Sequence, residues 1–117
     1  YCNSKLMNIL FTYEIHKRFK ETGITFNALH PGFVDTRFGD NNTGLGKSIL
    51  SIGKKLIAIN VVKGASTNVY LASSDEVKNV SGKYFDRSKS VRSSKVSHSE
   101  IHQEKLWSYS ENILNNL

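Results

Sequence analysis

The stretch GITFNALHPG, residues 23–32, decides how the chain folds. Gly23 can adopt the left-handed conformation that closes a helix, and the β-rich run at residues 24–29 is typical of a short strand. Pro31 lacks a backbone donor and Gly32 is flexible, so we expect the strand to end there and a loop to begin. The stretch therefore predicts a helix, a tight stop, a strand and a loop.

Residues 6–22, before this stretch, have the pattern of a helix. The first half is apolar on nearly all sides, whereas the second half carries mostly polar side chains, beginning with Glu14. We expect the first half to be buried all round and the second half to be exposed.

Residues 35–46, after this stretch, are polar and glycine-spaced, which favours a loop. Apolar residues then recur at helical intervals with lysines off the stripe. They are Leu45, Ile49, Ile52, Leu56 and Ile59. A second helix is predicted at residues 61–74, with small or β-branched residues on its inner side. These are Val62, Ala65, Val69 and Ala72.

The last third of the chain predicts a short strand at residues 81–85 and a closing helix at residues 99–117. Between them, six of the twelve residues at 88–99 are serine, so we expect a solvated connection that buries little. The helix has an apolar stripe at Leu106, Tyr109, Ile113 and Leu117. His98 and His102 would share one of its faces, but no third ligand accompanies them, so no metal site is predicted.

The order helix, strand, loop, helix, strand is the tail of an α/β layer fold. Two strands alone do not make a stable parallel sheet, so partner strands are expected from elsewhere. Position 1 is Tyr and the only methionine is Met7, so we expect the sequence to be part of a longer protein.

The formal net charge of +6 fits phosphate-bearing partners, such as nucleotides, RNA or a membrane surface, without choosing among them. The basic stretch at residues 83–95 has only two aromatics, so no nucleic-acid partner is predicted. No apolar run reaches the ~18 residues of a membrane-spanning helix. Cys2 has no second cysteine with which to form an internal disulfide.

Tyr1 and Lys5 are four residues apart at the start of a helix, so their side chains project from one face. A tyrosine ordinarily has a pKa of about 10, and a nearby cation lowers an acidic pKa by about 1–3 units, which suits proton transfer near neutral pH. This spacing is nevertheless common, and most such pairs only decorate a surface. Spacing alone leaves both interpretations open.

The whole chain resembles the C-terminal half of the short-chain dehydrogenase/reductase superfamily. The segment YCNSK, residues 1–5, is similar to that family's active-site motif, and NALHPGFVDT, residues 27–36, is similar to its strand and nicotinamide-side loop. Residues 64–73 resemble the next helix and residues 81–85 the last core strand. The details YCNSKL, HPG and KLW look most like the branch containing retinol dehydrogenases and protochlorophyllide reductases.

The resemblance implies the C-terminal half of a doubly wound Rossmann-type parallel sheet, incomplete as given. Tyr1 would be the general acid/base that exchanges a proton with the substrate oxygen while hydride moves to or from nicotinamide. Lys5 would lower the pKa of Tyr1 and hold the nicotinamide ribose. The other implied cofactor contacts, to NADP or NAD, are Pro31 and Gly32 in the loop, the backbone of Val34 and the hydroxyl of Thr36.

The resemblance also implies that residues 1–117 are the C-terminal part of a single NAD(P)-binding domain with four segments. It implies a catalytic helix at 1–22, a strand and cofactor loop at 24–36, a substrate lid at 37–60, and a helix, last strand and closing helix at 61–117. The glycine-rich turn and the catalytic serine of the family precede this sequence. We therefore expect a fragment, inactive by itself, of an oxidoreductase acting on an apolar, retinol-like alcohol or carbonyl.

Expectations about location and partners follow. The protein is expected in the cytoplasm or on the cytoplasmic face of a membrane, on which the apolar stripe of the lid can rest. The first helix commonly lies in the family's dimer interface, so a homodimer through it is expected. The alternative hypothesis is a non-catalytic, truncated partner that pairs through this helix.

Overall fold

The computed structural model of the protein describes residues 1–31 and 61–117. The helices are α1 (Cys2–Phe19), α3 (Val61–Ser73) and α4 (Glu100–Asn115), and the strands are β1 (Asn27–His30), β2 (Lys83–Asp86) and β3 (Lys89–Val91). Short 3₁₀ turns lie at Lys20–Thr22, Asp75–Val77 and Lys95–His98. The described residues form an α/β fold, as predicted.

The three strands form one mixed sheet in the order β1, β2, β3. β1 and β2 are parallel, with Ala28 opposite Tyr84, whereas β2 and β3 are antiparallel, with Phe85 opposite Ser90. Among the described residues, β1 has a partner strand on one edge only. The doubly wound sheet stays a prediction.

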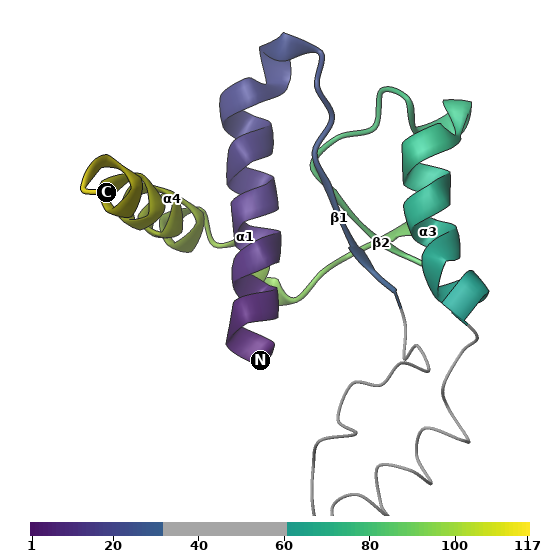
Figure 1. Ribbon diagram of the computed structural model, residues 1–117, viewed down its shortest axis with the longest axis horizontal. Coiled ribbons are helices and arrows are strands. Elements are labelled where there is room, and N and C mark those ends of the chain that lie inside the picture. The colour runs from purple at the N-terminus through teal and green to yellow at the C-terminus, as the bar shows by residue number, and fades with distance from the viewer. Residues whose placement is uncertain (32–60) are drawn as a thin grey trace, which may run out of the picture.

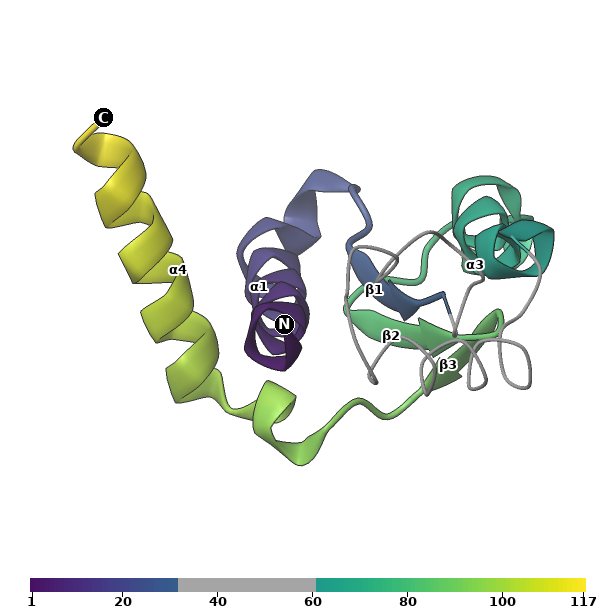
Figure 2. The same ribbon diagram turned by 60° about the horizontal axis from the view of Figure 1, so that its bottom comes forward.

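Helices flank the strands from both sides (Figures 1 and 2). α1 and α3 both contact β1, and α4 packs on α1, so α1 lies between the sheet and α4. α1 and β1 run in opposite directions (Figure 1). The N-terminus of α1 therefore lies at the end of the molecule where the parallel strands finish.

The chain turns from α1 toward β1 at Gly23, whose φ of 75° confirms the predicted left-handed stop. α1 begins at Cys2, before the predicted residue 6, because the Lys5 N–H already donates to the Tyr1 carbonyl. β1 begins later than predicted, at Asn27, where pairing with β2 begins, and it ends before Pro31, as predicted.

The prediction for the burial of α1 is wrong for its first half and for Glu14, whereas Lys17 and Arg18 of its second half are exposed, as predicted. In the first half Leu10 is buried, but Met7 is 50% exposed, because β1 and α4 cover only part of the helix. In the second half Glu14 is only 5% exposed. Its burial is tolerated because it pairs with Lys17 and Arg18.

The predicted inner face of α3 is also wrong. Val62 is 76% exposed and Val69 is exposed, whereas Gly64 and Thr67 are buried. The face is set by the neighbouring hairpin, because Thr67 Oγ1 accepts a hydrogen bond from the Ser88 N–H at 3.1 Å.

The serine-rich connection buries more than predicted. It contains β3, which a two-residue turn joins to β2, with Arg87 at φ 50° and Ser88 at φ 60°. Ser93 and Ser97 are buried because their hydroxyls hydrogen-bond to each other at 2.6 Å. The connection is therefore an ordered part of the fold.

The closing helix is confirmed, but the predicted stripe on it is not. Gln103 is buried and Trp107 stacks on Phe11 of α1, with ring centres 5.1 Å apart, whereas Tyr109 is exposed. α4 begins at Glu100, so His98 lies in the preceding 3₁₀ turn. The expectation that His98 and His102 share a helical face is therefore wrong.

Candidate functional site

The first turn of α1 brings together the two residues predicted to be catalytic. Lys5 Nζ lies 5.3 Å from the centre of the Tyr1 ring. Both side chains are exposed, so a bound molecule can reach them. A phenol and an ammonium group on one exposed helix face are suited to moving a proton to or from a ligand.

This first turn lies at the end of the sheet where the parallel strands β1 and β2 finish (Figure 1). β1 and β2 are parallel, so both finish at the end where α1 begins (Figure 1). Pro31 follows β1 directly and is exposed. Open α/β sheets bind ligands in the crevice outside the carboxyl ends of their strands. Tyr1, Lys5 and Pro31 are therefore all placed toward this end.

Three further residues that were predicted to contact a cofactor lie outside the described residues. They are Gly32, Val34 and Thr36. The predicted lid at residues 37–60 lies outside them as well. The roles assigned to these residues and to the lid stay predictions.

The sequence predictions did not include a side-chain hydrogen bond in this turn. Ser4 Oγ donates to the Tyr1 carbonyl at 2.7 Å. Serine hydroxyls commonly bond back to a carbonyl three or four residues earlier in a helix. The serine three positions after Tyr1 could therefore have predicted this hydrogen bond from the sequence.

The far half of α1 is fastened to the sheet through one hydroxyl. Ser81 Oγ lies 2.8 Å from Nδ1 of His16 and accepts the Phe26 N–H at 2.9 Å. Gly82 follows it at φ 69°, and a Cβ there would collide with the His16 ring. The hydroxyl thus connects α1, the approach to β1 and the turn before β2.

A buried carboxylate pairs with the arginine of α1 that contacts α4. Glu14 lies 2.8 Å from both Lys17 Nζ and Arg18 Nε, and the Arg18 guanidinium lies 4.8 Å from the Trp107 ring of α4. Burial raises the pKa of Glu14, but hydrogen bonds and positive charge from Lys17 and Arg18 outweigh it, so its pKa falls below the ordinary value of 4.5. The charged form of Glu14 is therefore favoured.

A buried polar cluster fastens the turn before α4 to α1. Ser93 Oγ lies 2.6 Å from both the Tyr13 hydroxyl and Ser97 Oγ, and 3.2 Å from Nε2 of His98. Ser97 donates its one proton to the Ser94 carbonyl at 2.6 Å. Ser93 must then donate to Ser97, while Tyr13 and His98 donate to Ser93. In this arrangement the Ser93 proton is used inside the cluster, which joins Tyr13 of α1 to the turn before α4.

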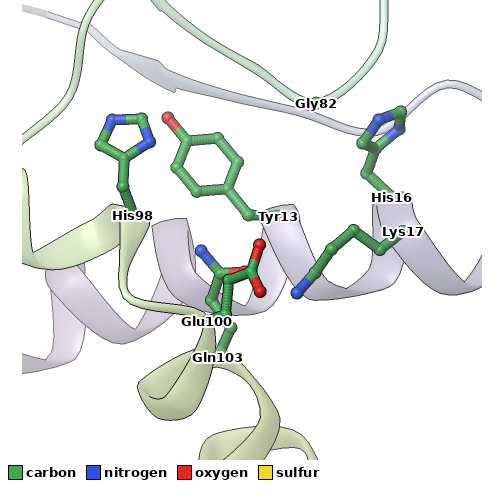
Figure 3. Close-up of a pocket in the computed structure, with 7 residues that line it drawn as sticks. All are labelled: Tyr13, His16, Lys17, Gly82, His98, Glu100 and Gln103. Carbon is green, nitrogen blue, oxygen red and sulfur yellow. The ribbon is translucent and has the colours of Figure 1, made fainter.

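A cavity of about 210 Å³ opens beside this cluster, between α1, the turn before β2 and the start of α4 (Figure 3). His16, Lys17, His98 and Glu100 line it. Tyr13, also in its wall, follows Lys5 by eight residues, or about 12 Å along the helix. The cavity is therefore separate from the Tyr1 and Lys5 pair.

Within residues 1–31 and 61–117, no three His, Cys, Asp or Glu side chains gather as metal ligands. No helix in these ranges has the length and apolar character needed to cross a membrane.

No family model matches the sequence. Among curated proteins, the chain is 41% identical over 113 residues to retinol dehydrogenase 14 of Homo sapiens, and 37% identical over 119 residues to human retinol dehydrogenase 13. It is 31% identical over 119 residues to the chloroplastic short-chain dehydrogenase TIC 32 B of Brassica napus. The alignments cover 95%, 97% and 100% of this chain, but 34%, 36% and 37% of these relatives.

The chain thus spans about a third of the length of the curated relatives that it matches. The likeness extends over nearly all of the 117 residues, so it covers far more than the short motif at the start of α1. The structure adds the α/β layers and parallel strands in the predicted order. The chain belongs to the short-chain dehydrogenase/reductase superfamily, in its retinol dehydrogenase branch.

Proposed function

We propose that the chain is the C-terminal part of an NAD(P)-dependent oxidoreductase that transfers hydride between nicotinamide and an alcohol or carbonyl substrate. The observation that carries this proposal is the exposed Tyr1 and Lys5 pair, with 5.3 Å between ammonium and ring centre, at the end where β1 and β2 finish. The names of the matched relatives, which include retinol dehydrogenases and a short-chain dehydrogenase, support it.

In this proposal Tyr1 exchanges a proton with the substrate oxygen, as a general acid in one direction and a general base in the other. The Lys5 ammonium stabilises the negative charge that grows on the phenol oxygen as the proton leaves. The same ammonium donates hydrogen bonds to ribose hydroxyls. The nicotinamide, when bound, supplies or accepts the hydride. The exposed Lys5 ammonium, a hydrogen-bond donor, lies beside the exposed Tyr1 phenol, and this arrangement fits a nicotinamide cofactor.

The remaining cofactor contacts come from the loop that begins after β1. Pro31 and Gly32 shape this loop, the backbone of Val34 meets the carboxamide, and the Thr36 hydroxyl lies near the cofactor. Support comes from Pro31, which directly follows β1 at the same end of the sheet as Tyr1. The cofactor is NADP or NAD.

The proposal includes an N-terminal part that completes the sheet. In the described residues only four apolar side chains are buried, and β1 has a partner strand on one edge. A core of this size is small for an independent domain. We therefore propose that further parallel strands join β1, and that residues 1–117 alone are inactive.

The proposed substrate is a small apolar molecule, similar to a retinol. The names of two matched relatives and the apolar stripe at residues 45–59 support this class. Residues 37–60 would cover the substrate. The proposed location is the cytoplasm or the cytoplasmic face of a membrane.

The test is steady-state kinetics of the whole protein with apolar alcohols and with NADP or NAD. Tyr1→Phe removes the proton donor and should lower kcat by about 100-fold or more, because general acid–base catalysis contributes about 10²–10⁴-fold. Tyr109→Phe changes an exposed tyrosine of α4 and should leave kcat unaltered. Turnover at the wild-type rate in Tyr1→Phe would refute the proposal.

The exposed surface of α1 favours a second candidate, in which the chain pairs through this helix. Met7 is half exposed and Phe11 is also exposed, so α1 presents apolar area to another copy. Met7→Lys should weaken such a dimer, measured by analytical ultracentrifugation. A homodimer is compatible with the enzyme, whereas the non-catalytic partner requires that Tyr1→Phe leave the biological function intact.

A further inference from the structure

We infer that Ser4 is a positioning residue that keeps Tyr1 and Lys5 facing each other. The inference rests on the proposed function and adds a third residue to the site. Ser4 is exposed, and its hydroxyl donates to the Tyr1 carbonyl at 2.7 Å.

Tyr1 and Lys5 meet only while the first turn of α1 stays helical, since a separation of four residues brings side chains together only in a helix. First turns fray readily because their N–H groups lack partners within the helix. The first turn of α1 holds no acidic side chain, which would favour the helix dipole there. Lys5 adds positive charge near the positive end of the helix dipole, which weakens this turn further.

The Tyr1 carbonyl is the point at which the turn closes. It accepts two hydrogen bonds, one from the Lys5 N–H at 3.1 Å and one from the Ser4 hydroxyl at 2.7 Å. Together the two donors fix the peptide plane that follows Tyr1. This plane sets the direction in which the Tyr1 ring leaves the backbone relative to Lys5.

Ser4→Ala in the whole protein tests the inference, because an exposed hydroxyl can be removed without leaving a cavity. The expected result is a three- to tenfold fall in kcat, about the effect of one net hydrogen bond, with the KM of the alcohol changed less than twofold. In alcohol oxidation, the pH at which kcat is half-maximal should move upward, because the ammonium would be held less steadily beside the phenol. Ser4→Thr should restore both values, because threonine also bonds back along a helix.

Ser66→Ala is the matched control. Ser66 is an exposed serine of α3 whose hydroxyl donates to the Lys63 carbonyl at 2.7 Å, also three residues earlier. This variant loses the same kind of bond far from Tyr1 in the sequence, so kcat and its pH dependence should stay unchanged.

Amide hydrogen exchange gives a readout that does not depend on turnover. Exchange in the first turn of α1 should be faster in Ser4→Ala than in the wild type or in Ser66→Ala. Faster exchange without loss of kcat, or loss of kcat without faster exchange, would overturn the inference.

The inference and the proposed function fail in different ways. Full kcat in Ser4→Ala, together with an inactive Tyr1→Phe, would remove Ser4 from the site and leave the oxidoreductase intact. Full kcat in Tyr1→Phe would remove the oxidoreductase proposal, and the role of Ser4 with it.

Discussion

Replacing Gly82 with alanine tests how α1 is held against the sheet. Gly82 has φ 69°, a left-handed conformation that costs an L residue about 1–2 kcal/mol. The new Cβ would also collide with the His16 ring, two of whose atoms lie only 2.8 Å from it. The ring would have to move, which breaks the 2.8 Å hydrogen bond between His16 Nδ1 and Ser81 Oγ.

The loss of this bond adds about 0.5–1.5 kcal/mol. Gly82→Ala should therefore lower the free energy of unfolding by about 1.5–3.5 kcal/mol. Gly23→Ala is the matched control, because Gly23 has φ 75° but no atom within 4 Å of a new Cβ. It should cost only the backbone term, about 1–2 kcal/mol.

Urea denaturation of the whole protein, monitored by far-UV circular dichroism, measures the loss in the free energy of unfolding for both glycine variants. His16→Ala removes the ring that Gly82→Ala would meet, so in that background the cost of Gly82→Ala should fall to the cost of Gly23→Ala. Equal losses in the two glycine variants, or a loss that His16→Ala leaves unchanged, would refute this account.

Three other contacts make predictions for stability. The pKa of Glu14 is lower in the folded state than its ordinary value of 4.5. The charge of Glu14 therefore stabilises the fold at pH values above 4.5, and this contribution is lost as the pH falls through the folded pKa. Glu14→Gln should therefore be less stable than the wild type at pH 7, and urea midpoints should converge in acid; a constant difference would contradict the ion pairs. Ser93→Ala leaves the Tyr13 hydroxyl without its acceptor and should cost about 1–3 kcal/mol, against less than about 0.5 for the exposed Ser94→Ala, in urea titrations. Trp107→Leu loses the contacts to Phe11 and Arg18 and should cost about 1–2.5 kcal/mol in thermal unfolding, with exposed Tyr109→Leu as the neutral control.

The elements that follow local signals were predictable from the sequence. Gly23 ends the first helical segment because glycine adopts positive φ, and Pro31 follows the strand because it lacks a donor. The Tyr1 and Lys5 pair was predictable for the same reason, since a separation of four residues fixes proximity within one turn.

The faces of the helices were not predictable, because distant contacts decide them. The inner side of α3 is the side that carries Thr67, which accepts a hydrogen bond from Ser88 of the following hairpin. The prediction from a stripe of valines and alanines therefore chose the wrong side. The hairpin itself was missed because its two turn residues, Arg87 and Ser88, have positive φ. The usual sequence signal for such a turn is Asn-Gly, which is not found here. The buried Ser93 was missed because its partner, Tyr13, lies 80 residues earlier in the chain.

These unpredicted contacts explain how α1, the helix that bears Tyr1 and Lys5, is held in place. Tyr13 fastens α1 to the turn before α4, Arg18 fastens it to α4 itself, and His16 fastens it to the turn before β2. All three lie at least eight residues beyond Lys5, so they hold the axis of the helix but not the geometry of its first turn. Within the first turn, the Tyr1 carbonyl accepts hydrogen bonds from both the Lys5 N–H and the Ser4 hydroxyl. In the inferred site, the Ser4 hydroxyl therefore acts together with the Lys5 N–H to keep Tyr1 opposite Lys5.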